Sequence, residues 1–327
     1  MITGTANEAG SGSPSFSIDK SGTLLWDAPG APGEYNIAFL IKEWRKVNGI
    51  WIQLGYVVRD MQIIIEDCLN QRPELAVPPD LCVEAGELIT IDVFGTDPDY
   101  DSVKLEAFSE IFSINPSPAN YSPRPPVFQK TNPGVDAKLT FSWQTTCNHV
   151  QDQPYQVVFK ITDKSGNGPS LVQFKTWNIK VVGPAPKWQP PQVDLGTRSA
   201  ILNWEEYACK NNASQMQIWR RVDQYVFTPP ECVTGMPDFL GYSLINVVPI
   251  GTTTFTDNNG GRGLSVGAQY CYRLVALFPQ PGGGESYVSQ EVCLPPILAD
   301  APVVTNVTID ITRSRGWAGN GSLEATL

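Results

Sequence analysis

Apolar and polar residues alternate along many short stretches of the chain, with Gly, Pro, Asn and Asp between them. Clear examples are residues 35–41, 61–65, 88–93, 155–161 and 270–277. A period of two places the apolar side chains on one face of a β-strand, and helical periodicity is almost absent. Gly and Pro number 28 each, which is typical of folds with many turns. The pattern predicts an all-β chain of tandem antiparallel β-sandwiches.

Proline clusters divide the chain. They lie at residues 72–79, 183–191 and 294–296, and proline marks edges and linkers because it cannot donate to a β-ladder. We therefore expect four units. Their predicted bounds are residues 1–68 (an incomplete module), 73–183 and 186–296 (complete modules), and 298–327 (the start of a truncated module). In the last unit, residues 300–312 are predicted to form a strand and residues 313–327 show no clear strand.

An internal repeat supports these boundaries. Residues 35–41 (YNIAFLI) match residues 155–161 (YQVVFKI), and both segments place Tyr, Ile or Val, Phe and Ile on one face. A second strand-like run follows in each copy, at residues 61–65 and 177–181. Each pair is interpreted as the last two strands of a sandwich. Few residues precede the first copy, so we expect the first module to lack its opening strands.

Charge and hydropathy exclude two classes of partner. The formal net charge is −10, which argues against nucleic-acid binding because that requires a basic surface. No apolar run approaches the ~20 residues needed to span a bilayer. We therefore expect neither nucleic-acid binding nor membrane insertion.

The cysteine pattern indicates disulfides. The chain has seven cysteines and one histidine, His149, and it has no CxxC pair, so zinc sites with the usual ligand spacing are nearly excluded. Scattered cysteines in a strand-rich chain indicate an oxidising compartment. Residues 1–15 have neither the basic region nor the apolar stretch of a signal peptide. For a disulfide-bearing protein, this predicts that the natural N-terminus lies further upstream.

Strand spacing predicts one disulfide. A hairpin centred near residue 282 places Cys271 and Cys293 directly opposite each other, eleven residues from the centre on either side. Opposite positions on antiparallel strands can reach the ~5.5 Å Cα separation of a disulfide.

The other pairings are predicted within single modules. Cys209 then remains for Cys232, and Cys82 is the natural partner of Cys147. Cys68 is left over, with a partner in the missing part of the first module or as a free thiol.

The first two modules resemble a known class. Residues 16–26 (FSIDKSGTLLW) resemble the FxIDxxTGxLxW stretch of bacterial cadherin-like and Ig-like modules. Residues 84–99 (EAGELITIDVFGTDPD) resemble the cadherin-like opening, with its early Glu, its Gly turn and its TDPD sequence. Together these similarities cover residues 1–183.

Alternating acids in this opening form the one candidate metal site. Asp97, Asp99 and Asp101 could converge on a calcium ion, which takes several oxygen ligands. The resemblance places further ligands at Glu84 and Asp163. A Gly-Pro-Ala-Pro sequence stands where the linker motif completes such sites in cadherins. The alternative is a solvated acidic turn, whose geometry Asp favours.

The third module resembles fibronectin type III. The similarity rests on residues 200–204 (AILNW), 216–221, 254–257 and 264–276. It implies that Trp204 is a core residue of the second strand. It also implies that Tyr270 forms the tyrosine corner, in which the hydroxyl bonds to a nearby backbone group. One departure is a long Pro- and Gly-rich insertion at residues 227–239.

The order of the modules resembles that of gliding-motility-associated proteins with type B sorting domains, which the type IX system of Bacteroidetes secretes. The sorting domain itself is not present in this sequence. The resemblance implies display on the outer surface of a Gram-negative cell, or secretion, with structural or adhesive duties. Cell-surface glycans or proteins are the implied partners, and a monomeric string of modules is the expected state.

Catalysis has little support in the sequence, so we expect no enzyme activity. His149 has no matching nucleophile motif. Adjacent acids such as Glu205 and Glu206 point to opposite faces of a strand and make no glycosidase pair. The expected function is a structural or adhesive region. The alternative is an accessory carbohydrate-binding or spacer region of a secreted polysaccharide-degrading enzyme.

Overall fold

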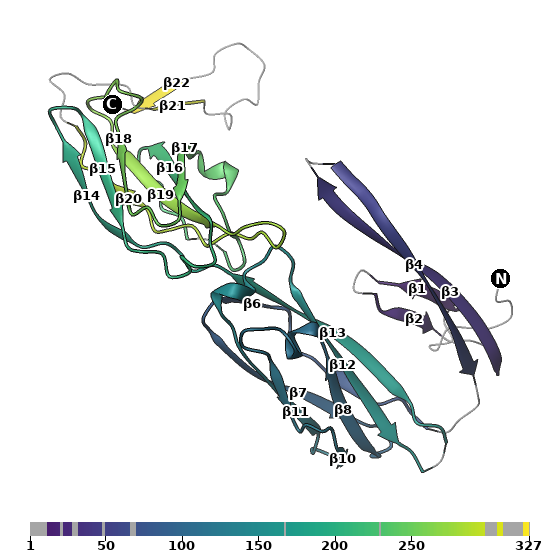
Figure 1. The fold of residues 1–327 in the computed structure, drawn as a ribbon. Coiled ribbons are helices and arrows are strands. Elements are labelled where there is room, and N and C mark those ends of the chain that lie inside the picture. The colour runs from purple at the N-terminus through teal and green to yellow at the C-terminus, as the bar shows by residue number, and fades with distance from the viewer. Residues whose placement is uncertain are drawn as a thin grey trace.

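The computed structural model describes residues 12–19, 22–27, 32–47, 50–65, 70–166, 168–228, 230–297, 306–309 and 323–326. Across these residues the regular structure is β-strand, apart from three short 3₁₀ turns. The strands form separate antiparallel sheets, with one parallel pair, and Figure 1 shows them arranged in two sandwiches and additional hairpins. The all-β fold expected from the alternating pattern is confirmed.

The first complete pair of sheets, here called the middle sandwich, spans residues 74–182. One sheet has the order β10 (Phe128–Lys130), β8 (Ser102–Phe108), β12 (Tyr155–Lys164), β13 (Val172–Val182) and β6 (Leu81–Glu84). The other has the order β5 (Glu74–Ala76), β7 (Leu88–Thr96), β11 (Ala137–Gln144) and β9 (Asn120–Ser122). Strand β6 pairs with β13 in parallel, and the other pairings are antiparallel.

Alternation along the strands builds the core of this sandwich. Phe159 on β12 is 1% exposed and Phe141 on β11 is fully buried. The Phe141 ring meets the Trp177 ring edge-on, with 5.5 Å between centroids, which is a favourable geometry for aromatic pairs across two sheets. The Trp177 indole N–H donates to the carbonyl of Pro79 at 2.8 Å, so its polar atom is satisfied.

A second pair of sheets, the C-terminal sandwich, spans residues 188–293. One sheet has the order β14 (Trp188–Asp194), β15 (Ser199–Trp204) and β18 (Thr254–Asp257). The other has the order β17 (Ser243–Pro249), β16 (Gln215–Val222), β19 (Tyr270–Leu277) and β20 (Val292–Cys293). Trp204 is 2% exposed, at the core position that the sequence predicts for it.

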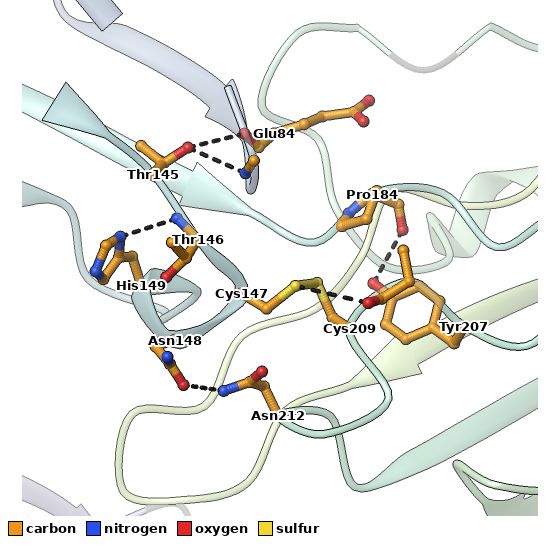
Figure 2. The surroundings of a disulfide bond; sticks show 12 residues. Glu84, Thr145, Thr146, Cys147, Asn148, His149, Pro184, Tyr207, Cys209 and Asn212 are labelled. Atoms are coloured by element: carbon orange, nitrogen blue, oxygen red, sulfur yellow. Dashed lines mark hydrogen bonds between the residues drawn. A yellow bond between two sulfur atoms is a disulfide. The ribbon is translucent and has the colours of Figure 1, made fainter. Parts of the chain in front are cut away.

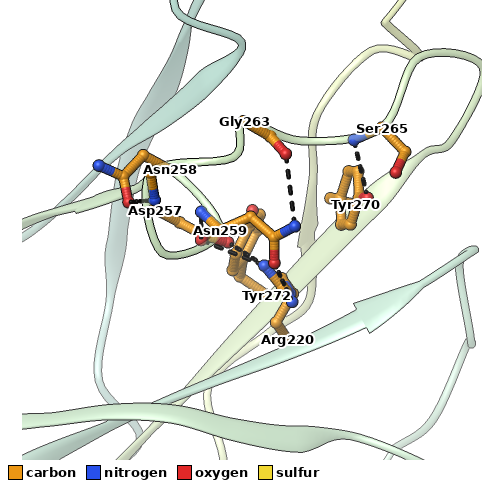
Figure 3. Close-up of polar contacts among 9 residues, drawn as sticks. Arg220, Asp257, Asn258, Asn259, Gly263, Ser265, Tyr270 and Tyr272 are labelled. Atoms are coloured by element: carbon orange, nitrogen blue, oxygen red, sulfur yellow. Dashed lines mark hydrogen bonds and ion pairs between the residues drawn. The ribbon is translucent and has the colours of Figure 1, made fainter.

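A polar network joins the two sheets of this sandwich (Figure 3). Arg220 on β16 donates to both carboxylate oxygens of Asp257 on β18, at 3.1 and 2.9 Å, and the Tyr272 hydroxyl on β19 donates to the same carboxylate at 2.9 Å. Beside it, the Tyr270 hydroxyl accepts a hydrogen bond from the backbone N–H of Ser265 at 3.1 Å. This is the contact expected of a tyrosine corner.

The N-terminal strands form two hairpins. Strands β1 (Ser15–Ile18) and β2 (Leu24–Asp27) pair with each other, and the long strands β3 (Gly33–Val47) and β4 (Ile50–Ile65) form their own two-stranded sheet. The repeat extends to the register of pairing. Tyr35 lies opposite Ile63 on β3–β4, as Tyr155 lies opposite Ile179 on β12–β13, and the match continues along both strands.

The two copies of this hairpin differ in what surrounds them. In the middle sandwich, β8 and β6 flank β12 and β13, and the face that carries Phe159 is buried. The β3–β4 sheet has no third strand among the described residues, and it carries twelve of the large apolar side chains that are exposed. A two-stranded sheet has too few neighbours to bury its apolar face.

At the C-terminal end, β21 (Asn306–Ile309) pairs with β22 (Leu323–Thr326). The expectation that residues 313–327 lack a strand is therefore wrong. The tetrapeptide of β22 is too short for a period of two to stand out from its neighbours in the sequence.

The repeat generates a stability prediction. Replacing Phe159 with Ala should cost the middle sandwich about 3–5 kcal/mol of unfolding free energy, because the ring is fully packed. The matched substitution Phe39→Ala, at the equivalent position of the β3–β4 hairpin, should leave the unfolding transition of the middle sandwich unchanged, because Phe39 is only half-buried and lies outside that sandwich. Chemical denaturation followed by tryptophan fluorescence measures the unfolding free energy of both variants. Equal losses in the two variants would contradict the placement of Phe159 in the core of the middle sandwich and of Phe39 outside it.

Candidate functional site

The predicted metal ligands Asp97, Asp99 and Asp101 lie in the turn between β7 and β8. Asp163 on β12 pairs with Val103 at the start of β8, so it reaches the same end of the sandwich. Asp97 and Asp163 are 3% and 0% exposed. The structure therefore brings four of the five predicted ligands to one end of the middle sandwich.

Glu84 is the exception, and its inclusion in this set is wrong. It ends β6 opposite Val182, whereas the acidic turn lies near the start of β13 at Val172. Ten strand residues separate these points, which is roughly 30 Å. The resemblance placed Glu84 by its sequence motif, but the strand direction carries it to the other end of the sandwich.

Hydrogen bonds already occupy five of the eight carboxylate oxygens of Asp97, Asp99, Asp101 and Asp163. Asp97 Oδ1 accepts from the N–H groups of Asp99 and Asp101 at 2.9 and 3.1 Å. Both Asp99 oxygens accept from Gln71. Asp163 accepts from the N–H of Leu171 and from the Asn70 amide, each at 2.6 Å.

One carboxylate oxygen in the turn differs from the rest. Asp97 Oδ2 is buried and has no hydrogen-bond donor among the described residues. Burial, together with the charges of Asp101 and Asp163, raises the pKa of Asp97 despite the two backbone hydrogen bonds. Calcium takes six to eight oxygens, whereas donors within the protein already bind Asp97 Oδ1 and both carboxylate oxygens of Asp99 and Asp163. As arranged, these residues fit a hydrogen-bonded turn better than a calcium site.

This arrangement predicts insensitivity to chelators. The melting temperature of the chain should be the same in EDTA as in millimolar calcium, since the aspartates are held by N–H donors. Differential scanning fluorimetry measures it. A fall of several degrees in EDTA that calcium restores, and that Asp97→Asn abolishes, would instead establish a cation site in this turn.

The disulfides connect the two sandwiches. Cys82 bonds to Cys232 and Cys147 bonds to Cys209, with Cα separations of 5.7 and 5.4 Å. The predicted pairs Cys82–Cys147 and Cys209–Cys232 are therefore wrong, because they assumed that each module closes its own disulfides. Cys271 bonds to Cys293, the pair expected from the hairpin. Cys68 lies outside the described residues.

We call the region where the sandwiches meet the joint, and Figure 2 shows one side of it. The Cys147–Cys209 disulfide lies between a 3₁₀ turn (Cys147–His149) of the middle sandwich and the segment after β15. Next to it, the Tyr207 hydroxyl donates to the carbonyl of Pro184 at 2.9 Å. The side chains of Asn148 and Asn212 are hydrogen-bonded across the joint.

The connecting segment is packed tightly at Gly183. Its carbonyl accepts from the Tyr287 N–H at 2.9 Å, and its own N–H donates to the carbonyl of Glu285. A Cβ atom at residue 183 would lie 2.7 Å from the Tyr207 hydroxyl oxygen and 3.1 Å from the backbone of Ser286. Only glycine fits this approach between linker and sandwich.

Two grooves open beside the joint. One, of about 610 Å³, is lined by both cysteines of the Cys82–Cys232 disulfide together with Asp80, Lys180 and other residues. The other, of about 710 Å³, runs along the linker past Trp188 and includes Glu84. Burial raises the pKa of Glu84, and Glu87 nearby adds to the effect. Neither groove is lined by a serine, a threonine, a histidine or a free cysteine.

The only group of three potential metal ligands within 4.8 Å of one another, among the residues that the structure describes, is Cys271, Glu291 and Cys293. The two cysteines form a disulfide, so they offer no thiolate to a metal.

His149 is a structural residue of the joint. It is 2% exposed, and its Nδ1 accepts the backbone N–H of Thr146 at 3.0 Å. Nδ1 is therefore unprotonated, and Nε2 carries the proton that is donated to the carbonyl of Pro116 at 2.9 Å. Burial lowers the pKa of His149. The neutral ring fixes the turn that carries Cys147.

This pKa shift predicts acid sensitivity. His149 in the unfolded chain has the ordinary histidine pKa of 6.5, whereas its pKa in the folded chain is lower. Below pH 6.5 the unfolded chain therefore binds a proton more readily than the folded chain does, so the free energy of unfolding falls as the pH drops through 6.5. His149 is the only histidine, so His149→Gln should flatten the slope between pH 5 and 7, although at lower overall stability. Urea titrations across this range measure the difference, and identical slopes would contradict it.

No protein-family model matches the chain, and no curated protein matches it significantly. Similar solved structures include the R347E mutant of the SrpA adhesin from Streptococcus sanguinis (16% identity, 38% of this chain and 63% of that one, TM-score 0.28). Titin domains A168–A170 are 12% identical over 85% of this chain and 88% of that one, with a TM-score of 0.26.

A third similar structure is a nucleoside hydrolase-related protein from Saccharophagus degradans. It is 18% identical over 34% of this chain and 26% of that one, with a TM-score of 0.24. At such TM-scores these likenesses carry no argument about function. In the described part of the chain, no helix is long and apolar enough to cross a bilayer.

Proposed function

We propose that the chain is a stiff, non-catalytic spacer of a secreted or cell-surface protein, which holds binding modules at a fixed distance and orientation. The observation that carries this proposal is the pair of disulfides across the joint, Cys82–Cys232 and Cys147–Cys209. Tandem modules usually move relative to each other, because a short linker between them restrains little.

Three covalent connections restrict this joint. The main chain crosses it at Gly183, and the two disulfides cross it from different elements, β6 and the turn at Cys147. A single linker leaves bending and twisting free, whereas connections at several separate points oppose both. Each disulfide also restricts the unfolded chain, which is worth roughly 4 to 5 kcal/mol for loops of this size in the entropy account.

The disulfides also support the location. Three of them require an oxidising environment, which favours an extracellular protein. The resemblance to type IX sorting-domain proteins adds the finer proposal of display on the outer surface of a Gram-negative cell. In that setting the spacer serves adhesion or gliding, through glycan- or protein-binding modules attached to it.

Single-molecule energy transfer tests the stiffness. Dyes attached through non-natural amino acids at Val135 and Leu195, both exposed, mark turns of the middle and C-terminal sandwiches. The wild-type chain should give one narrow distance distribution at all salt concentrations. Replacing Cys82, Cys232, Cys147 and Cys209 with Ser should broaden it. A broad distance distribution in the oxidised wild type would contradict the spacer proposal.

A further inference from the structure

The Cys82–Cys232 disulfide joins two points that are far apart in the sequence. Cys82 lies on β6, the second strand of the middle sandwich, and Cys232 lies in the long insertion of the C-terminal sandwich, 150 residues later. A covalent path that enters at Asn70 therefore reaches the C-terminal sandwich after a few residues. It does so without passing through β7 to β16.

We propose that this disulfide is a force bypass, which carries tension from one sandwich to the next and keeps the intervening residues out of the load path. The inference rests on the proposed spacer function and extends it, because a spacer between a surface and a bound partner is pulled along its length. The load on such a spacer is a tension applied at its two ends.

The shortest covalent path can be traced residue by residue. From Asn70 it runs to Cys82, crosses to Cys232, continues to Cys271, crosses to Cys293 and leaves at Ile297. About 58 residues lie on it, so at ~3.5 Å per residue it extends to about 200 Å. Without disulfides, residues 70–297 would extend to about 800 Å.

The strands on this path share one property. Strands β5, β6, β17 and β18 all lie at the edges of their sheets. The central strands β7, β8, β11, β12, β13, β15 and β16 all lie within the bypassed residues. The Cys271–Cys293 disulfide likewise shields all but the first two residues of the remaining central strand, β19. Tension can therefore peel edge strands, but the core-forming strands cannot be pulled out of their sheets in sequence.

The second disulfide of the joint, Cys147–Cys209, has a different mechanical role. Cys147 and Cys209 both lie between Cys82 and Cys232 in the sequence, so their bond lies off the shortest path. It fixes the orientation of the sandwiches and carries no end-to-end load while Cys82–Cys232 is intact. The two bonds of one joint are thereby predicted to differ in a measurable way.

Force spectroscopy on the full chain tests this difference. Handles are ligated enzymatically to the two termini, so that no cysteine is consumed, and the final extended length is measured under oxidising conditions. The variant Cys82→Ser/Cys232→Ser should extend about 300 Å further than wild type, since the shortest path then runs through Cys147–Cys209. The matched control Cys147→Ser/Cys209→Ser should match wild type. With both pairs replaced, the gain should be about 520 Å.

Residues outside 70–297 contribute equally to every variant, so they cancel in these differences. Should a variant fail to fold, wild type pulled before and after phosphine reduction should gain about 600 Å. Equal extension of the two paired variants, or no gain on reduction, would overturn the bypass. The energy-transfer experiment decides the spacer proposal separately. A narrow distance distribution supports the spacer even when the extended lengths contradict the bypass. A broad distribution contradicts the spacer, whatever lengths are measured.

Discussion

The covalent closure of the joint is the constraint on which the arrangement of this molecule depends. Each sandwich buries the alternating apolar faces of its strands between its two sheets, and the buried apolar residues of both sandwiches belong to one continuous cluster. The Cys82–Cys232 and Cys147–Cys209 disulfides join them covalently, and the close packing at Gly183 adds to this connection. The neutral ring of His149 belongs to the same construction, because it sets the turn that presents Cys147.

Local pattern was sufficient for the strongly alternating strands and for one disulfide, though not for the short β22. Strands such as β12 and β19 follow from a period of two, and the Cys271–Cys293 pair follows from counting along a hairpin, since both depend on residues close in sequence. The Trp204 and Tyr270 positions follow for the same reason, because each sits in a recognisable strand.

The pairing across the joint depends on how two sandwiches are turned relative to each other, and no local pattern encodes that rotation. The sequence did contain a signal. The insertion at residues 227–239 carries a cysteine and has no place in a simple sandwich, so a role outside its own module could have been inferred. The acidic turn shows the same limit. Asp97 and Asp99 lie in the same turn because they are two residues apart in the sequence. The position of Glu84 depends on the direction of β6, which no local pattern gives.

The cross-linked joint also bears on inheritance. Tandem modules of secreted proteins commonly spread between genes one at a time, because each is self-sufficient. Here, a gene that received the middle sandwich alone would gain Cys82 and Cys147 without their partners, two thiols open to mispairing during export. The two sandwiches are therefore expected to be duplicated, exchanged or lost as a single cassette, with both pairs of cysteines travelling together.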